Sequence, residues 1–139
     1  MTKLFLALPL LLTSGCAVPM LFGRPAAETP WRAEGRQPSW AVLIQGETID
    51  LHLGAAGGDR SWRYVRPHLR GEDRIWRAGH GNRGVTITAR HGPCSLPGEA
   101  AGTTLNYEHY VIVKLGRDGS QYYGCGGRIF AVSSGPPAR

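Results

Sequence analysis

The sequence predicts an all-β domain, a small antiparallel barrel or sandwich of seven or eight short strands cross-linked by one disulfide. Glycine (20 residues) and proline (10 residues) make up about a fifth of the 139-residue chain, a composition that favours turns over long helices. Between residues 40 and 132, short segments of alternating apolar and polar residues are separated by turn signals. This spacing is typical of strands in barrels and sandwiches.

The segment 48–53 (TIDLHL) illustrates the pattern. Ile49, Leu51 and Leu53 alternate with polar residues, so one face of the strand should be buried and the other exposed to solvent. The longest run is 106–115 (NYEHYVIVKL), and 74–78 is the weakest. The expected strands are 41–45, 48–53, 61–66, 74–78, 85–90, 106–115, 121–125 and 128–132.

A glycine-rich segment, 79–84 (GHGNRG), fits the G-x-G-x-x-G pattern of dinucleotide-binding proteins. Dinucleotide binding by that pattern requires a helix directly after it, because the helix N-terminus supplies amide donors to the pyrophosphate. Residues 85–90 alternate as a strand instead. We therefore predict a loop that joins two strands.

The first fifteen residues have the features of a signal peptide. Lys3 is followed by the apolar segment 4–12 (LFLALPLLL), which is too short to span about 30 Å of hydrocarbon as a helix. The segment 13–16 (TSGC) resembles the lipobox of bacterial lipoproteins, although Thr13 stands where a large aliphatic residue is usual. The resemblance implies cleavage before Cys16 and attachment of a diacylglycerol to its thiol. The alternative is a plain secretory signal that is cleaved near Ala17.

Lipidation at Cys16 implies a protein anchored to the bacterial cell envelope by its lipid and facing the periplasm. Ala17 follows the cysteine where an aspartate would favour the inner membrane, so the outer membrane is the expected location. Prolines 19, 25, 30 and 38 predict that residues 16–38 are a flexible tether. The β-domain is expected at 39–132 and a disordered tail at 133–139.

The other two cysteines, Cys94 and Cys125, are 31 residues apart in a domain that is expected to be exported. A disulfide is the natural interpretation, and it leaves Cys16 as the odd cysteine. A metal site formed by His91, Cys94 and Cys125 is the alternative, but it needs a fourth ligand and a reducing compartment.

The sequence contains no constellation that predicts a catalytic centre, a cofactor or a metal ion. The five histidines lack ligand spacing, and Gly-x-Ser-x-Gly is absent. Asp50 and Glu108 could meet as a carboxylate pair on facing strands. Trp40 and Trp62 are expected in the core rather than in contact with a ligand.

The net charge of +6 is the excess of sixteen basic over ten acidic residues, and only Lys3 and Lys114 among the basic residues are lysines. The arginines are scattered and form no basic run, so the simplest interpretation is a solvated basic surface. Nucleic acid is not an expected partner for an exported domain. Anionic lipid, a cell-wall polymer or an acidic protein are the alternatives.

Three segments resemble a family of uncharacterised periplasmic lipoproteins with a G-N-E-P-x-W opening, a central cysteine and a final G-C-G-R. They are 35–40 (GRQPSW), 94–98 (CSLPG) and 124–128 (GCGGR). Arg36 and Gln37 replace the Asn-Glu pair, and one extra glycine precedes Arg128. The family carries no assigned reaction.

The combination of lipid anchor, disulfide and β-domain is also similar to the membrane-bound inhibitors of C-type lysozyme, with Tyr107 and Lys114 nearest to their inhibitory residues. We expect a membrane-anchored envelope lipoprotein whose domain binds an envelope protein or a cell-wall ligand and is not an enzyme. The alternatives are a lysozyme-inhibitor-like protein and an envelope hydrolase that uses carboxylates.

Overall fold

A computed structural model describes residues 29–63, 67–117 and 119–135. Within these residues, nine antiparallel strands form one sheet in the order β4-β3-β2-β1-β9-β8-β7-β6-β5. The all-β expectation is confirmed, but the sheet is not closed into a barrel, because β4 and β5 are its two edges. The elements are β1 (Trp31–Arg36), β2 (Ser39–Gln45), β3 (Thr48–His52), the 3-10 helix η1 (Gly54–Ala56), β4 (Asp59–Arg63), β5 (His68–Arg70), β6 (Asp73–Ala78), the 3-10 helix η2 (Gly81–Arg83), β7 (Val85–Pro97), β8 (Thr103–Leu115) and β9 (Gln121–Ser134).

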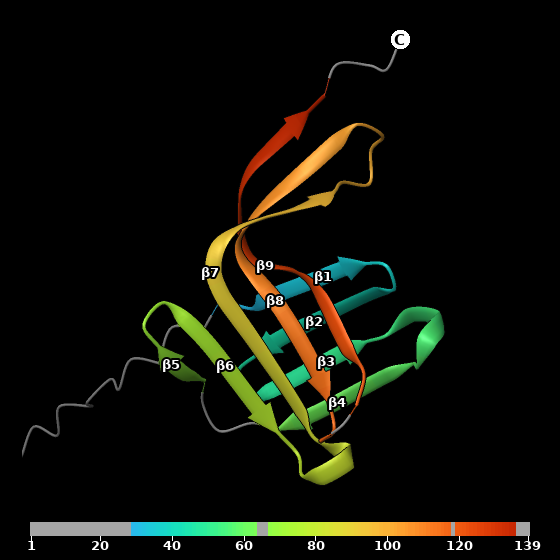
Figure 1. Ribbon diagram of the computed structural model, residues 1–139, viewed down its shortest axis with the longest axis vertical. Coiled ribbons are helices and arrows are strands. Elements are labelled where there is room, and N and C mark those ends of the chain that lie inside the picture. The colour runs from blue at the N-terminus through green and yellow to red at the C-terminus, as the bar shows by residue number, and fades with distance from the viewer. Residues whose placement is uncertain (1–28, 64–66, 118, 136–139) are drawn as a thin grey trace, which may run out of the picture.

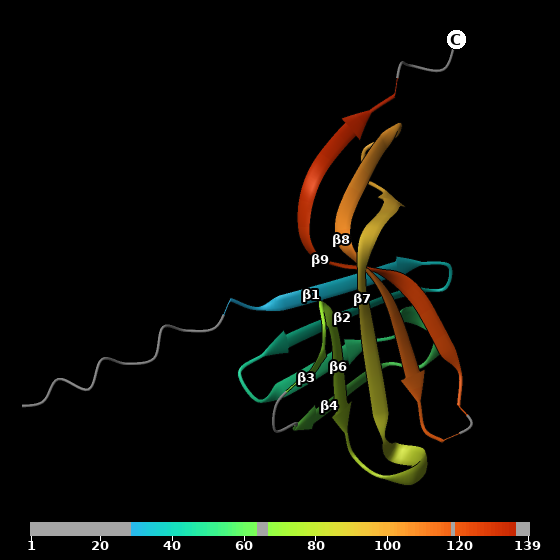
Figure 2. The ribbon, with the colours of Figure 1, turned by 60° about the vertical axis from the view of Figure 1, so that its left-hand side comes forward.

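The sheet folds over so that its two halves pack against each other. Strands β1–β4 cross β6–β9 in both views (Figures 1 and 2). The predicted alternation of β3 is confirmed, since Ile49 and Leu51 are buried and Asp50 is exposed. The core consists of Ala33, Trp40, Val42, Ile44, Ile49, Leu51 and Leu53 from the first half and Trp76, Ala78, Val85, Ile87, Ala89, Val111, Val113 and Leu115 from the second.

The first strand lies inside the segment that was predicted to be a tether. Residues 31–36 pair along their whole length with β2, so the boundary at residue 38 is wrong. Ala33 is buried, and the ring of Trp31 lies 4.6 Å from that of Trp76 between centroids. Pro30 and Pro38 flank β1 and do not interrupt it. The earlier part of the predicted tether, together with the predicted signal peptide and Cys16, lies outside the described residues.

Several other strands differ from the prediction in their bounds or number. The short edge strand β5 was not expected, and the predicted strands 121–125 and 128–132 form the single strand β9. β9 continues to Ser134, past the expected start of the disordered tail at residue 133, and β7 continues to Pro97 instead of ending at residue 90. The long strands pass their internal glycines with register shifts, so glycines 92, 126 and 127 do not end them.

The outer ends of β7, β8 and β9 form a three-stranded extension that we call the arm, residues 94–97, 103–107 and 129–134. Figure 1 shows it extending beyond the rest of the sheet, in yellow, orange and red. Cross-strand pairs place Leu96, Leu105 and Val132 on one face of the arm. Val132 is 63% exposed, so the arm contributes little to the core.

Two segments, 35–40 and 124–128, lie against each other near the pairing of β1 with β9. The indole nitrogen of Trp40 donates to the carbonyl oxygen of Tyr123 at 3.1 Å. A Cβ on Gly35 would lie 2.1 Å from that nitrogen, and a Cβ on Gly124 would lie 2.0 Å from the carbonyl oxygen of Glu34. These glycines are therefore required by close packing of the strands.

Candidate functional site

The arm is joined covalently to the body of the sheet. The predicted disulfide is confirmed: Cys94 in the arm is bonded to Cys125 in the part of β9 that pairs with β1. Cys94 pairs with Tyr107 across β7 and β8, so both side chains project from the same face of the arm. The bond therefore turns this face toward β1.

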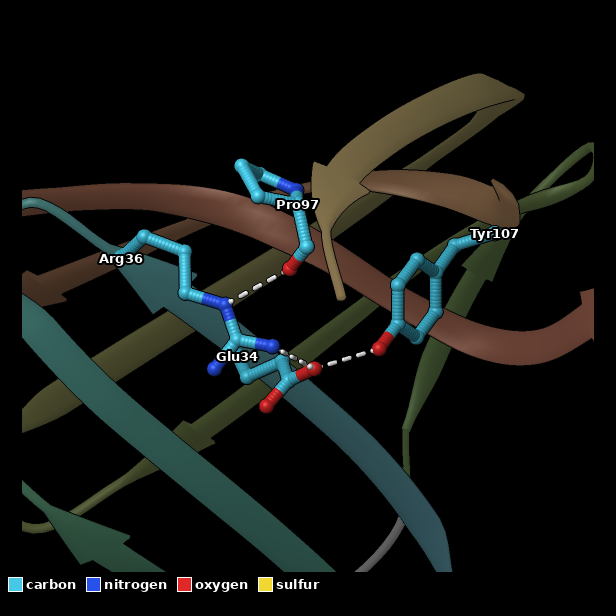
Figure 3. A network of polar contacts seen from close by, with 4 residues as sticks. All are labelled: Glu34, Arg36, Pro97 and Tyr107. Atoms are coloured by element: carbon cyan, nitrogen blue, oxygen red, sulfur yellow. Dashed lines mark hydrogen bonds and ion pairs between the residues drawn. The ribbon is translucent and has the colours of Figure 1, made fainter. Parts of the chain in front are cut away.

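Polar contacts connect the same face to β1 (Figure 3). The hydroxyl of Tyr107 donates to Oε1 of Glu34 at 2.5 Å, and Nη2 of Arg36 lies 3.3 Å from the same oxygen. Nε of Arg36 donates to the carbonyl oxygen of Pro97 at 3.2 Å. Glu34 and Arg36 thus contact two strands of the arm, the central strand β8 through Tyr107 and β7 through Pro97.

The phenol of Tyr107 stays protonated in this setting. Burial raises its pKa above the ordinary value, and the hydrogen bond to Glu34 and the charge of that carboxylate raise the pKa further. Arg36 has the opposite, smaller effect on the pKa. Tyr107 is therefore a permanent donor to Glu34 at physiological pH.

A cleft of about 900 Å³ lies between the arm and the outer face of β1–β4. One wall comes from outward-facing positions of the four strands, and the other comes from Tyr107, Gly127 and Ile129. A cleft of this size with a mixed lining suits a small ligand or a segment of a partner protein. The outward-facing residues of the strand wall are Arg32, Glu34, Ala41, Leu43, Asp50, His52, Asp59 and Ser61.

The strand wall contains three carboxylates, two of which have partners from the neighbouring strand. The hydroxyl of Ser61 donates to Asp50 at 2.6 Å, and Nδ1 of His52 contacts the carboxylate of Asp59. The third, Glu34, contacts Tyr107. The wall can therefore present hydrogen-bond acceptors to a ligand beside the apolar surface of the cleft.

The carboxylate pair considered from the sequence does not form. Asp50 lines the cleft, whereas Glu108 is not among the residues that line it. Oε1 of Glu108 accepts a hydrogen bond from Nε of Arg128 at 2.8 Å, and Nη2 of Arg128 forms an ion pair with the same oxygen at 2.6 Å. This hydrogen bonding lowers the pKa of Glu108, so its carboxylate serves as a partner for Arg128.

The histidines include one pair that the sequence did not predict. The rings of His91 and His109 lie 5.5 Å apart between centroids, and His109 is buried. Burial lowers the pKa of His109, and the nearby charges of Arg74 and His91 lower it further. Within the described residues, no group of three or more His, Cys, Asp or Glu side chains is placed to hold a metal ion.

The tryptophans and the glycine-rich loop have the predicted roles. Trp40 is buried in the core, and Trp62 packs against the core while its indole donates to the carbonyl oxygen of Arg83 at 2.7 Å. Residues 79–84 join strands β6 and β7. The loop is therefore not followed by the helix that dinucleotide binding requires.

Sequence reasoning missed Glu34 and Arg36, because both fall in the segment that was assigned to the tether. The missed signal is the alternation over 31–36 (WRAEGR), where Trp31 and Ala33 face the core and charged residues face outward. Prolines on either side of this segment hid the pattern.

The chain matches no protein-family model, no curated protein and no solved structure. Among the described residues, no helix is long and apolar enough to cross a membrane.

Proposed function

We propose that this protein is a lipid-anchored protein of the bacterial cell envelope whose cleft binds an envelope protein or a cell-wall ligand without catalysing a reaction. The lipobox-like segment and Cys16 support the anchor, and Ala17 favours the outer membrane, with the domain facing the periplasm. The disulfide between Cys94 and Cys125 agrees with an oxidising compartment.

The observation that carries the binding proposal is the cleft between the arm and the strand wall. The disulfide and the bond from Tyr107 to Glu34 hold the two walls in place before any ligand arrives. A preformed site avoids much of the entropy cost of ordering on binding. Its mixture of carboxylates, arginines and apolar side chains suits recognition of a polar polymer or a protein segment.

The anchor is tested by mass spectrometry of the mature N-terminus from envelope preparations. We expect a peptide that begins at a diacylated Cys16, and a Cys16→Ser variant that carries no lipid and leaves the membrane fraction. An unmodified peptide beginning at Cys16 or later in the wild-type protein would contradict the anchor and leave the cleft proposal to its own test.

Ligand binding is tested by placing a photoreactive residue at Ala41, which is exposed and lines the cleft. Leu69 on β5, which is 64% exposed and does not line the cleft, is the control position. In intact cells we expect a discrete adduct from position 41 and none from position 69. Identical adduct patterns from both positions would refute specific binding in the cleft.

A hydrolase is the second candidate, because Glu34, Asp50 and Asp59 line the same cleft. It predicts release of soluble fragments from purified cell wall, and this release would be lost in an Asp50→Asn variant. The lysozyme-inhibitor alternative predicts inhibition of C-type lysozyme by the purified domain. If the protein neither releases cell-wall fragments nor inhibits lysozyme, both alternatives are refuted and binding without catalysis remains the proposal.

A further inference from the structure

A second hollow, with a volume of about 310 Å³, lies at the end of the sheet where the β6–β7 and β8–β9 turns meet. Both views place the two turns side by side (Figures 1 and 2). The amide of Gly116 donates to the carbonyl oxygen of Gly84 at 2.8 Å and joins the turns. This hollow, which we call the basic hollow, shares no lining residue with the cleft.

Three basic side chains line the basic hollow: Arg77, Lys114 and Arg117. Arg77 pairs with Thr86 across β6 and β7, and Thr86 pairs with Lys114 across β7 and β8. Directly opposed residues in antiparallel strands project from the same face. Two cationic side chains therefore flank the hydroxyl of Thr86 in one row, and Arg117 extends from the adjacent turn.

These cations lack acidic partners of the kind that Arg36 and Arg128 have. Arg36 contacts Glu34, and Arg128 contacts Glu108, in each case within 3.3 Å. Within the described residues, Arg77, Lys114 and Arg117 form neither an ion pair nor a side-chain hydrogen bond. No acidic residue is among those that line the basic hollow. Their positive charge is therefore uncompensated by the lining.

The spacing of the row suits a shared anion. Arg77 and Lys114 are two strands apart, about 10 Å between Cα atoms by the usual strand spacing. Side chains of this length can converge on one anion above Thr86. A guanidinium group binds two phosphate oxygens with parallel N–H bonds, and an ammonium group adds a compact positive charge.

The remaining wall is mostly bare backbone, which allows an oxygen-rich group to approach closely. A Cβ on Gly81 would meet nothing within 4 Å, so this part of the wall is open. At Gly79 a Cβ would lie 2.8 Å from the carbonyl oxygen of Arg83, and the φ of +70° also favours glycine. The glycines that line the hollow are Gly79, Gly81, Gly84 and Gly116.

We propose that the basic hollow binds a phosphate group, held by Arg77, Lys114 and Arg117 above the hydroxyl of Thr86. The phosphate comes either from the headgroup of an anionic phospholipid or from a soluble phosphorylated molecule. The site depends on neither the lipid anchor nor ligand binding in the cleft. In this proposal the loop 79–84 forms part of the wall of a phosphate site, and this role does not require a helix after the loop.

The test uses residues 16–139 with Cys16→Ser, exported behind an unrelated signal peptide so that every described residue is kept and no attached lipid contributes. NMR titration with inorganic phosphate at constant ionic strength should shift the amides of Gly81 and Gly116 in a saturable manner. Sedimentation with vesicles of phosphatidylglycerol and phosphatidylethanolamine forms the second arm. Vesicle binding without phosphate binding identifies the lipid headgroup, and the reverse identifies a soluble phosphate.

The informative variant is Arg77→Gln combined with Lys114→Gln. Its matched control is Arg63→Gln combined with Arg70→Gln, which removes the same charge from exposed positions on β4 and β5, outside the basic hollow. We expect the first pair to weaken binding at least about tenfold and the control pair to retain it. Equal weakening by both pairs, or saturation in neither arm for the wild-type domain, would overturn the proposal.

Discussion

The hydroxyl of Tyr107 lies 2.5 Å from Oε1 of Glu34, and this contact joins residues that are 73 positions apart. Tyr107 belongs to the arm and Glu34 belongs to β1, so their hydrogen bond connects the two walls of the cleft. Together with the disulfide, it sets the angle of the arm over the strand wall.

Tyr107→Phe should lower the free energy of unfolding by about 1–3 kcal/mol, because the ring remains while a partly buried hydrogen bond to a charged group is lost. Urea unfolding followed by tryptophan fluorescence measures the change. Tyr123→Phe is the matched control, since that tyrosine is 52% exposed and its hydroxyl donates to Gln121. The control should change stability by less than about 0.5 kcal/mol. Equal losses of unfolding free energy in the two variants would show that the contact with Glu34 does not stabilise the fold.

Removing the disulfide should cost about 3–4 kcal/mol in the free energy of unfolding. The bond closes a loop of 31 residues, and the cost is the loop-closure entropy regained by the unfolded chain. Cys94→Ser combined with Cys125→Ser is compared with the parent domain, both carrying Cys16→Ser. Thiol labelling of the denatured, unreduced parent provides the check, because labelling at both positions would contradict the pairing.

The buried imidazole of His109 should make the fold sensitive to acid. Burial lowers its pKa, Arg74 and His91 lower it further, and Glu108 opposes them. Below the ordinary histidine pKa of about 6.5, the unfolded chain therefore binds a proton that the folded chain resists. The free energy of unfolding therefore falls as the pH decreases below about 6.5. At higher pH the imidazole is neutral in both states, and its titration does not change the stability.

His109→Gln should reduce the loss of stability between about pH 7.5 and about pH 5, because the substituted side chain does not titrate. Urea unfolding at the two pH values measures the difference. His68→Gln, at an exposed position on β5, should keep the acid sensitivity of the parent. An unchanged pH dependence in His109→Gln would assign the effect to other groups.

Gly124→Ala should destabilise the domain by about 3 kcal/mol or more, because overpacking forces backbone shifts. The added Cβ would lie 2.0 Å from the carbonyl oxygen of Glu34 and 2.7 Å from the Trp40 ring, and neither can move freely. Gly135→Ala adds the same atom where the nearest neighbour is 3.8 Å away, and it should be nearly neutral. Thermal unfolding of the two variants compares them directly; equal melting temperatures would refute the packing argument.

Much of the strand pattern could be predicted because alternation is a local property. Ile49 and Leu51 face the core and Asp50 faces outward, as their period of two requires. Local signals failed at β1, where prolines on both sides favoured a tether, and at β9, which was expected as two strands, 121–125 and 128–132. In both places, pairing with a neighbouring strand overrides local composition.

By itself, the sequence determined the all-β class, the role of the glycine-rich loop as a connection and the pairing of Cys94 with Cys125. The class follows from composition and alternation, the loop from the alternation after it, and the pairing from the number of cysteines in a domain that is expected to be exported. Only the tertiary structure decided that Glu34 meets Tyr107, that Asp50 and Glu108 lie apart, and that Arg77 and Lys114 share one row. These relationships depend on how the sheet folds over and on register shifts in β7, β8 and β9, which are set by packing between residues distant in sequence.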